Sequence, residues 1–118
     1  KNDKDALRKL EQLEQANEPQ HVTVITIFEI FSGLARSQQP EEEKRKIIDV
    51  LDGQIILPFN QIDAEKAGQI DGVLIKEGKT IDVPDSMIGG IALIKQEKVL
   101  TRNQKHFSRI KGLKVETY

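Results

Sequence analysis

The feature that most constrains the fold is a set of short, continuous runs of β-branched and aliphatic residues separated by longer helical segments. Strands whose apolar residues run on without alternation are typical of parallel sheets buried on both faces. Such strands are predicted at residues 22–25, 54–59 and 98–101, and a last strand at 113–117 is expected at an edge. The chain is therefore predicted to form an α/β fold with a mostly parallel sheet between layers of helices.

The segments between these runs have the residue spacing of helices. In the first of them, Leu7, Leu10 and Leu13 form an apolar stripe. Helices are predicted at residues 3–16, 26–36, 41–51, 63–77 and 84–96, and a turn or short helix at 103–107. The helix at 26–36 is apolar nearly all round, so it is expected to be buried. The 118 residues contain no repeat and fit one domain, residues 1–118.

Composition narrows the class of protein. The chain has no cysteine, which excludes disulfides and thiolate metal sites and suits the cytoplasm. It has no apolar run near the roughly 20 residues of a membrane helix, so no membrane partner is expected. A net charge of −1 and 4% aromatics provide neither a basic field nor a stacking platform for bulk nucleic acid. An RNA partner would therefore be held through local basic patches or metal ions.

Polar residues just after the strands are the candidates for a site, because sites in parallel sheets form beyond the carboxyl ends of strands. Glu29 follows the first strand, and its carboxylate is expected to point into a cleft there. Thr26 and Glu29 also fit a capping box, which in isolation is the preferred interpretation.

A second acidic candidate lies near the start of the helix at 84–96. Asp85 follows Pro84, so its carboxylate suits either the helix dipole or a metal ion. Asp82 is a further candidate and is expected in solvent. Gly89 and Gly90 cost this helix about 1 kcal/mol each relative to alanine. The helix is therefore predicted to approach the sheet, or a second subunit, closely.

The residues after the strand at 98–101 are polar as well. Asn103 could hold a metal-bound water or a phosphate, although a plain turn with asparagine is the simpler interpretation. Thr101 and Arg102 lie beside it and are candidates for substrate binding. His21 and His106 have no metal-ligand spacing with each other. A basic patch follows, and its side chains are expected to face water: Lys105, His106, Arg109 and Lys111.

Together these segments resemble the PIN-domain ribonucleases, in particular the VapC-type toxins of VapBC toxin–antitoxin pairs. The resemblance rests on residues 24–33, 85–93, 99–107 and 112–115 and covers essentially the whole chain from the first helix onward. It implies a PIN-like three-layer fold. It also implies that Glu29 and Asp85 bind metal, and that Asn103 stands where many members have a fourth acid.

The resemblance implies a Mg²⁺- or Mn²⁺-dependent endoribonuclease that hydrolyses RNA and has a cognate antitoxin protein. Such ions prefer oxygen ligands, activate water and relieve charge on a phosphate. The resemblance also implies a homodimer. The candidates for contacts with the antitoxin or with a second copy are Phe28, Phe31 and Leu34. The alternative is a non-catalytic PIN-like module that binds RNA or protein and uses its carboxylates as helix caps. A response-regulator-like module is disfavoured. It would need an acidic pocket with a phosphorylatable aspartate after a strand and a lysine downstream, and the sequence offers no convincing position for both.

The start of the chain departs from the family. PIN domains open with a central strand that ends in an aspartate, the first metal ligand, and no residue here matches it. Without that strand two ladders would be unpaired. The natural protein is therefore expected to carry an apolar strand and an aspartate upstream of Lys1.

Overall fold

The computed structural model describes residues 3–16, 19–38, 40–101 and 103–117. Its helices and strands follow the order predicted from the sequence, and both strand pairings among these residues are parallel. The α/β class is therefore confirmed. The chain divides into two compact units, Lys1–Leu57 and Pro58–Tyr118. No helix in the described ranges has both the length and the apolar character needed to cross a membrane.

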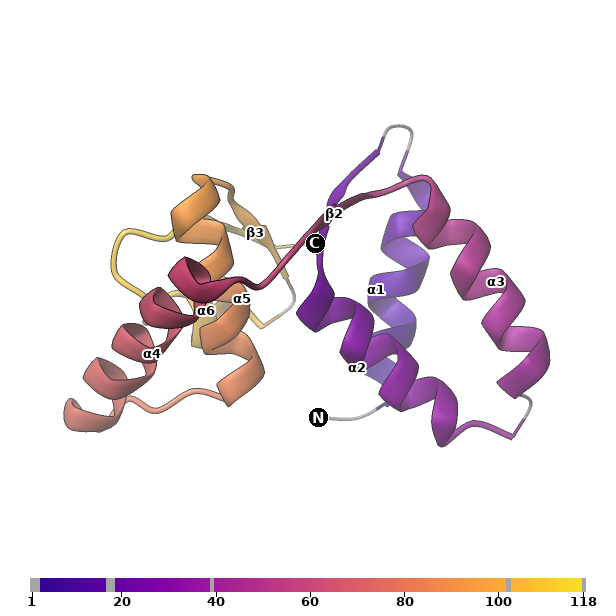
Figure 1. Ribbon diagram of the computed structural model, residues 1–118. Coiled ribbons are helices and arrows are strands. Elements are labelled where there is room, and N and C mark those ends of the chain that lie inside the picture. Colours follow the sequence, from indigo (N-terminus) through magenta and orange to yellow (C-terminus); the bar gives the residue numbers. More distant parts are fainter. Residues whose placement is uncertain (1–2, 17–18, 39, 102, 118) are drawn as a thin grey trace. The chain divides into compact units, whose positions relative to one another are not determined.

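The first unit is built from helices joined through a short parallel ladder (Figure 1). Its elements are α1 (Asp3–Gln15), β1 (His21–Thr23), α2 (Val24–Ala35), α3 (Pro40–Asp52) and β2 (Ile55–Leu57). In the ladder, His21 lies opposite Ile55 and Thr23 opposite Leu57. The core of this unit is aliphatic and comes from all of its helices: Leu10, Ile30, Leu34 and Ile47.

The boundary between β1 and α2 lies earlier than predicted. The Thr23 hydroxyl oxygen accepts the backbone N–H of Thr26 at 3.1 Å, so Thr23 is the N-cap and the helix begins at Val24. The predicted capping box of Thr26 and Glu29 is therefore wrong. Thr26 occupies the third helical position, and Glu29 lies one turn further along α2.

Two predictions of burial in the first unit are also wrong. Ile55 and Ile56 of β2 are 46% and 41% exposed, although their run was expected to be buried. Phe28 of α2 is 69% exposed, although this helix was expected to be covered all round. β-Branched residues favour extended backbone whether or not they are covered, so such a run predicts the strand and not its burial.

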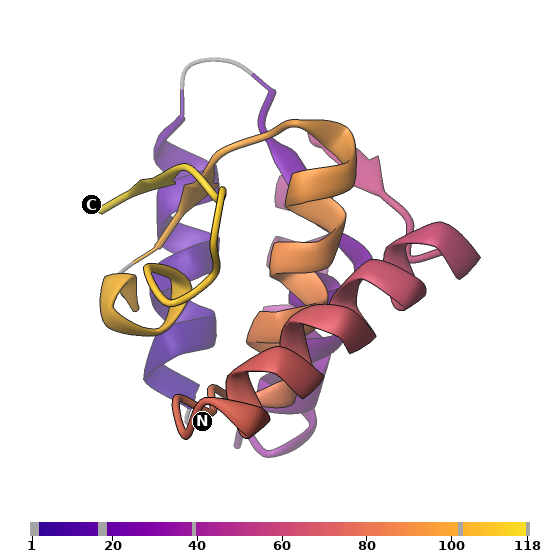
Figure 2. The same ribbon diagram turned by 90° about the vertical axis from the view of Figure 1, so that its left-hand side faces the viewer.

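The second unit contains α4 (Gln61–Lys76), α5 (Val83–Lys95), β3 (Val99–Leu100), α6 (Gln104–Phe107) and β4 (Val115–Glu116). Helix α4 lies across α5 (Figure 2), and β3 pairs with β4 so that Val99 lies opposite Val115. The start of α4 is a reciprocal capping box between Asn60 and Asp63. The core gathers residues from α4, the loop before α5, α5, β3, α6 and the C-terminal turn at residues 108–113: Leu74, Ile81, Ala92, Val99, Phe107 and Ile110.

The glycines of α5 lie at close packing contacts. A Cβ on Gly90 would lie 2.8 Å from the backbone nitrogen of Ala67 in α4, and one on Gly89 would lie 2.5 Å from Cδ1 of Ile110. The close approach predicted from the sequence is thus made to a neighbouring helix and to the C-terminal turn, and not to the sheet. It packs α5, the helix that carries Asp85, against α4.

Candidate functional site

Asp85 lies in the first turn of α5 and is only 2% exposed. The turn is formed by Asp82, whose carbonyl oxygen accepts the backbone N–H groups of Asp85 at 3.0 Å and Ser86 at 3.2 Å. Asp82 is the N-cap of the helix but makes no capping hydrogen bond with its side chain, and a proline follows within the first turn. A carboxylate in the first turn of a helix lies where the helix dipole favours negative charge.

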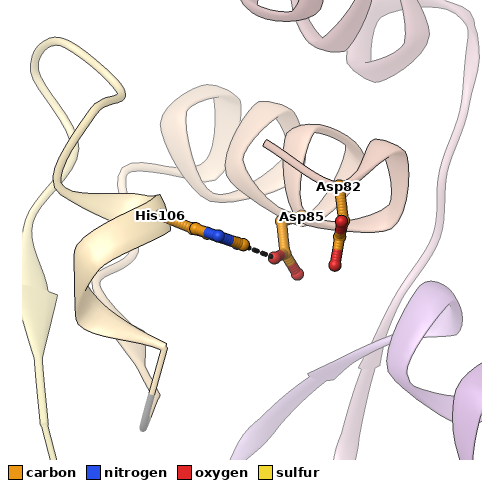
Figure 3. Close-up of side chains that lie close together, drawn as sticks. All are labelled: Asp82, Asp85 and His106. Carbon is orange, nitrogen blue, oxygen red and sulfur yellow. Dashed lines mark hydrogen bonds and ion pairs between the residues drawn. The ribbon is translucent and has the colours of Figure 1, made fainter. Parts of the chain in front are cut away.

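Asn103 and His106 come to Asp85 from the segment after β3. The Asn103 amide Nδ2 donates to Oδ2 of Asp85 at 3.0 Å and lies 2.9 Å from Nδ1 of His106. The same Nδ1 lies 3.3 Å from Oδ2 of Asp85, the contact drawn in Figure 3. One carboxylate oxygen, one amide nitrogen and one imidazole nitrogen therefore meet at a single point.

The turn that carries Asn103 is held by backbone and hydroxyl groups. Asn103 donates its backbone N–H to the Thr101 hydroxyl oxygen at 2.8 Å. Its carbonyl oxygen accepts from the backbone N–H groups of His106 and Phe107, which begins α6. Asn103 is the N-cap of α6 but makes no side-chain capping bond. The asparagine is thus more than a turn residue, because its amide is directed to Asp85.

Asp82 extends this cluster toward solvent. It is exposed, as predicted, and one carboxylate oxygen lies within 4.8 Å of ligand atoms of Asp85 and His106. Figure 3 shows the Asp82 carboxylate beside that of Asp85, with the His106 ring approaching from α6. The two carboxylates fit a divalent cation, since oxygen ligands suit Mg²⁺ and Mn²⁺, and the imidazole lies beside them.

Glu29 belongs to the first unit, where it lies half-buried on α2. The Glu29 carboxylate interacts electrostatically with the ammonium group of Lys9 in α1. Burial lowers the pKa of Lys9, and the carboxylate of Glu29 raises it in part. Since Asp85 and Asn103 belong to the second unit, the meeting of Glu29 with them stays a prediction.

The basic patch after Asn103 is more engaged with the protein than expected. Lys105 and Lys111 are exposed, as predicted. Arg109 instead donates through Nη1 to the carbonyl oxygens of Lys79 at 3.3 Å and Thr80 at 2.9 Å, which ties the C-terminal turn to the loop before α5. The prediction that all its members face water is therefore wrong. Arg102, a candidate for substrate binding, lies outside the described residues.

His106 is the residue of the cluster that was not predicted. Its side chain is only 29% exposed and faces Asp85, whereas the sequence suggested a solvated histidine without metal-ligand spacing. The feature of the sequence that could have identified His106 is its spacing of three residues from Asn103. Residues three apart lie on the same face of a helix, so Asn103 and His106 were placed to act together.

The chain matches one protein family over most of its length and is similar to proteins of known name. The family described as PIN domain matches residues 1–113. The chain is 28% identical over 97 residues to the tRNA(fMet)-specific endonuclease VapC of Shigella flexneri, a match covering 82% of this chain and 74% of that protein. It is 33% identical over 101 residues to Ribonuclease VapC1 of Methanocaldococcus jannaschii, with 80% and 68% covered.

The fold is also similar to that of solved structures. VapBC2 of Rickettsia felis, bound to a DNA fragment from its promoter, matches with a TM-score of 0.80 and 25% identity over 95% of this chain and 84% of that one. DNA-bound VapBC of Salmonella typhimurium matches with a TM-score of 0.79 and 26% identity over 96% and 84%.

Proposed function

This chain belongs to the PIN domain family, and on that premise we propose that it is a metal-dependent endoribonuclease of the VapC type. It would hydrolyse RNA phosphodiester bonds in the cytoplasm as the toxin of a toxin–antitoxin pair. Its similarity to proteins named ribonuclease VapC supports the activity. The observation that carries the proposal is the buried carboxylate of Asp85, which Asn103 and His106 contact at one point.

The residues of the second unit that would hold Mg²⁺ or Mn²⁺ are Asp85 and Asp82. Glu29 of the first unit remains a proposed ligand from the sequence alone. The ion would reduce charge on the scissile phosphate and favour ionisation of the attacking water. The protein's own contribution is orientation. Asn103 donates to Asp85 from a turn that Thr101 holds in place, so the carboxylate is directed before substrate arrives.

Contacts to RNA would come from the segment around the same site. Lys105, which directly precedes His106, and Lys111 are exposed, and cations of this kind bind phosphates without regard to sequence. Thr101 and Arg102 remain our candidates for contacts closer to the scissile bond. With an overall charge of −1, the chain would rely on such local cations together with the bound metal.

We also propose an antitoxin partner and a homodimer, as the similarity to VapBC complexes suggests. Of the apolar residues expected to make these contacts, Leu34 lies in the core of the first unit and Phe31 packs against that core. Leu34 is buried and Phe31 is partly buried, so Leu34 offers little surface to a partner. Phe28 is 69% exposed and is the most exposed of the three candidates on α2.

The function is tested by RNA cleavage with the intact protein, its Asp85→Asn variant and Gln104→Ala as a matched surface control. tRNA is the first substrate to try, with total RNA beside it and with Mn²⁺ or a chelator added. We expect cleavage by the unmodified protein and by Gln104→Ala with Mn²⁺ only, and none by Asp85→Asn. Cleavage by Asp85→Asn at the normal rate would place the active site elsewhere. Inactivity of the unmodified protein on every RNA would favour the non-catalytic module.

A further inference from the structure

We propose that His106 is a positioning residue that sets the orientation of the Asn103 amide, and through it the carboxylate of Asp85. The inference rests on the proposed function, because it concerns the same site. Three contacts carry it: Asn103 Nδ2 to Asp85 Oδ2 at 3.0 Å, Asn103 Nδ2 to His106 Nδ1 at 2.9 Å, and His106 Nδ1 to Asp85 Oδ2 at 3.3 Å.

One assignment of donors and acceptors lets the Asn103 amide nitrogen donate to both of its neighbours. An amide nitrogen carries two N–H donors and no acceptor, so Asn103 Nδ2 donates to both of its neighbours. The Nδ1 atom of His106 must then offer a lone pair, and the ring proton lies on Nε2. This arrangement leaves no hydrogen between His106 Nδ1 and Asp85 Oδ2, and that contact is the longest of the three.

The reverse arrangement is unfavourable. If the amide were turned over, the Asn103 carbonyl oxygen would take the place of Nδ2, 3.0 Å from a carboxylate oxygen. A His106 with its proton on Nδ1 could donate to that oxygen, but two acceptors would then face each other at Asp85. The bond from an amide N–H to an ionised carboxylate is stronger than a neutral one. The tautomer of His106 and the orientation of Asn103 are therefore coupled.

Asn103 and His106 together place a hydrogen-bond donor, and no second negative charge, beside the buried carboxylate of Asp85. An aspartate at position 103 would place a second negative charge near Asp85, and such a pair requires a cation or a proton. Asn103 instead supplies an N–H donor, and His106 holds that donor in the direction of Asp85. His106 thus acts on Asp85 through Asn103 and needs no contact with substrate.

The tautomer can be measured directly by NMR. The chain has only two histidines, so a His106→Phe variant identifies the His106 signals in a long-range ¹H–¹⁵N correlation spectrum. The spectrum is recorded at mildly alkaline pH, where imidazoles are generally neutral. We expect a proton on Nε2 and a bare Nδ1. A proton on Nδ1 would overturn the proposal, and this measurement requires no nuclease activity.

A double-mutant cycle tests whether His106 acts through Asn103. We expect His106→Phe and Asn103→Ala each to lower kcat for RNA by about tenfold, with KM little changed, as is usual for residues that orient a ligand. The double variant should be no worse than Asn103→Ala. His106→Gln, which keeps an acceptor, should recover much of the lost rate, and Gln104→Ala should behave as the unmodified protein.

Losses that multiply in the double variant would show that His106 acts independently of Asn103, and would overturn the proposal. Measuring Mn²⁺ affinity for the same set of variants distinguishes failure of the proposed nuclease function from failure of the coupling between His106 and Asn103. If the unmodified protein binds Mn²⁺ but cuts no RNA, the proposed function fails while the coupling between Asn103 and His106 is still measured.

Discussion

The backbone of α5 at Gly90 lies directly against the backbone of α4 at Ala67. A Cβ on Gly90 would lie 2.8 Å from the nitrogen of Ala67 and 2.9 Å from its Cα and Cβ, so no side chain fits there. The same helix carries Asp85 little more than one turn earlier. The contact between the two helices therefore also determines where the buried carboxylate lies in the second unit.

Gly90→Ala should destabilise the protein, because backbone atoms of α4 would have to move. Overpacking of this kind costs about 1–3 kcal/mol, more than the roughly 1 kcal/mol that alanine gains over glycine in a helix. Urea unfolding measures the change in free energy.

Two other glycines serve as controls. A Cβ on Gly89 would meet only the tip of the flexible Ile110 side chain at 2.5 Å, so Gly89→Ala should stay within about 1 kcal/mol of the unmodified protein. Gly68 in α4 has nothing within 4 Å of such a Cβ, so Gly68→Ala should stabilise. Equal destabilisation by all three substitutions would contradict the specific contact between Gly90 and Ala67.

Mn²⁺ binding should depend strongly on Asp85 and less on Asp82. Asp85 is 2% exposed whereas Asp82 lies in solvent, so their carboxylates differ in how firmly they are held. We expect Asp85→Asn to weaken Mn²⁺ binding by about 100-fold and Asp82→Asn by about tenfold, or roughly 2.7 and 1.4 kcal/mol. Calorimetry at millimolar metal measures both. Equal affinities for all three proteins would exclude the cluster as the metal site.

The N-cap of α2 should contribute to stability through the hydroxyl of Thr23. Thr23→Val keeps the shape of the side chain but removes the acceptor for the Thr26 N–H, and we expect it to cost about 1 kcal/mol. Thr23→Ser keeps the acceptor and should cost less. Thermal unfolding of the two variants decides the matter, and a serine variant less stable than the valine variant would rule the cap out as the main contribution.

Lys9 should make stability depend on pH in the alkaline range. Burial lowers its pKa below the ordinary value of 10.5, and Glu29 offsets this in part. Between the folded and unfolded pKa values the unfolded chain binds more protons, so the stability contributed at this position rises with pH through that window. The unfolding free energy of Lys9→Met relative to the unmodified protein should therefore fall as pH rises toward 10.5. A difference that stays constant would show that the shift is absent.

Much of the secondary structure was predictable because it depends on neighbours in the chain. Each predicted helix exists, and most ends agree to within two residues, since apolar spacing and glycine or proline breaks act locally. The start of α2 was predicted late, because Thr23 and Thr26 are both plausible caps and only the backbone geometry distinguishes them. The single domain predicted for residues 1–118 remains a prediction beside the two compact units.

The sequence by itself determined which residues are candidates for the site: Asp85 at a helix start and Asn103 after a strand were both chosen from their positions along the chain. Only the tertiary structure decided that Asn103 contacts Asp85 across 18 positions, and that His106 turns inward to join them. It likewise decided that Gly90 packs against Ala67 and that Ile55 lies exposed. The physical reason is that local pattern specifies conformation, whereas partners distant in the chain depend on how the helices pack.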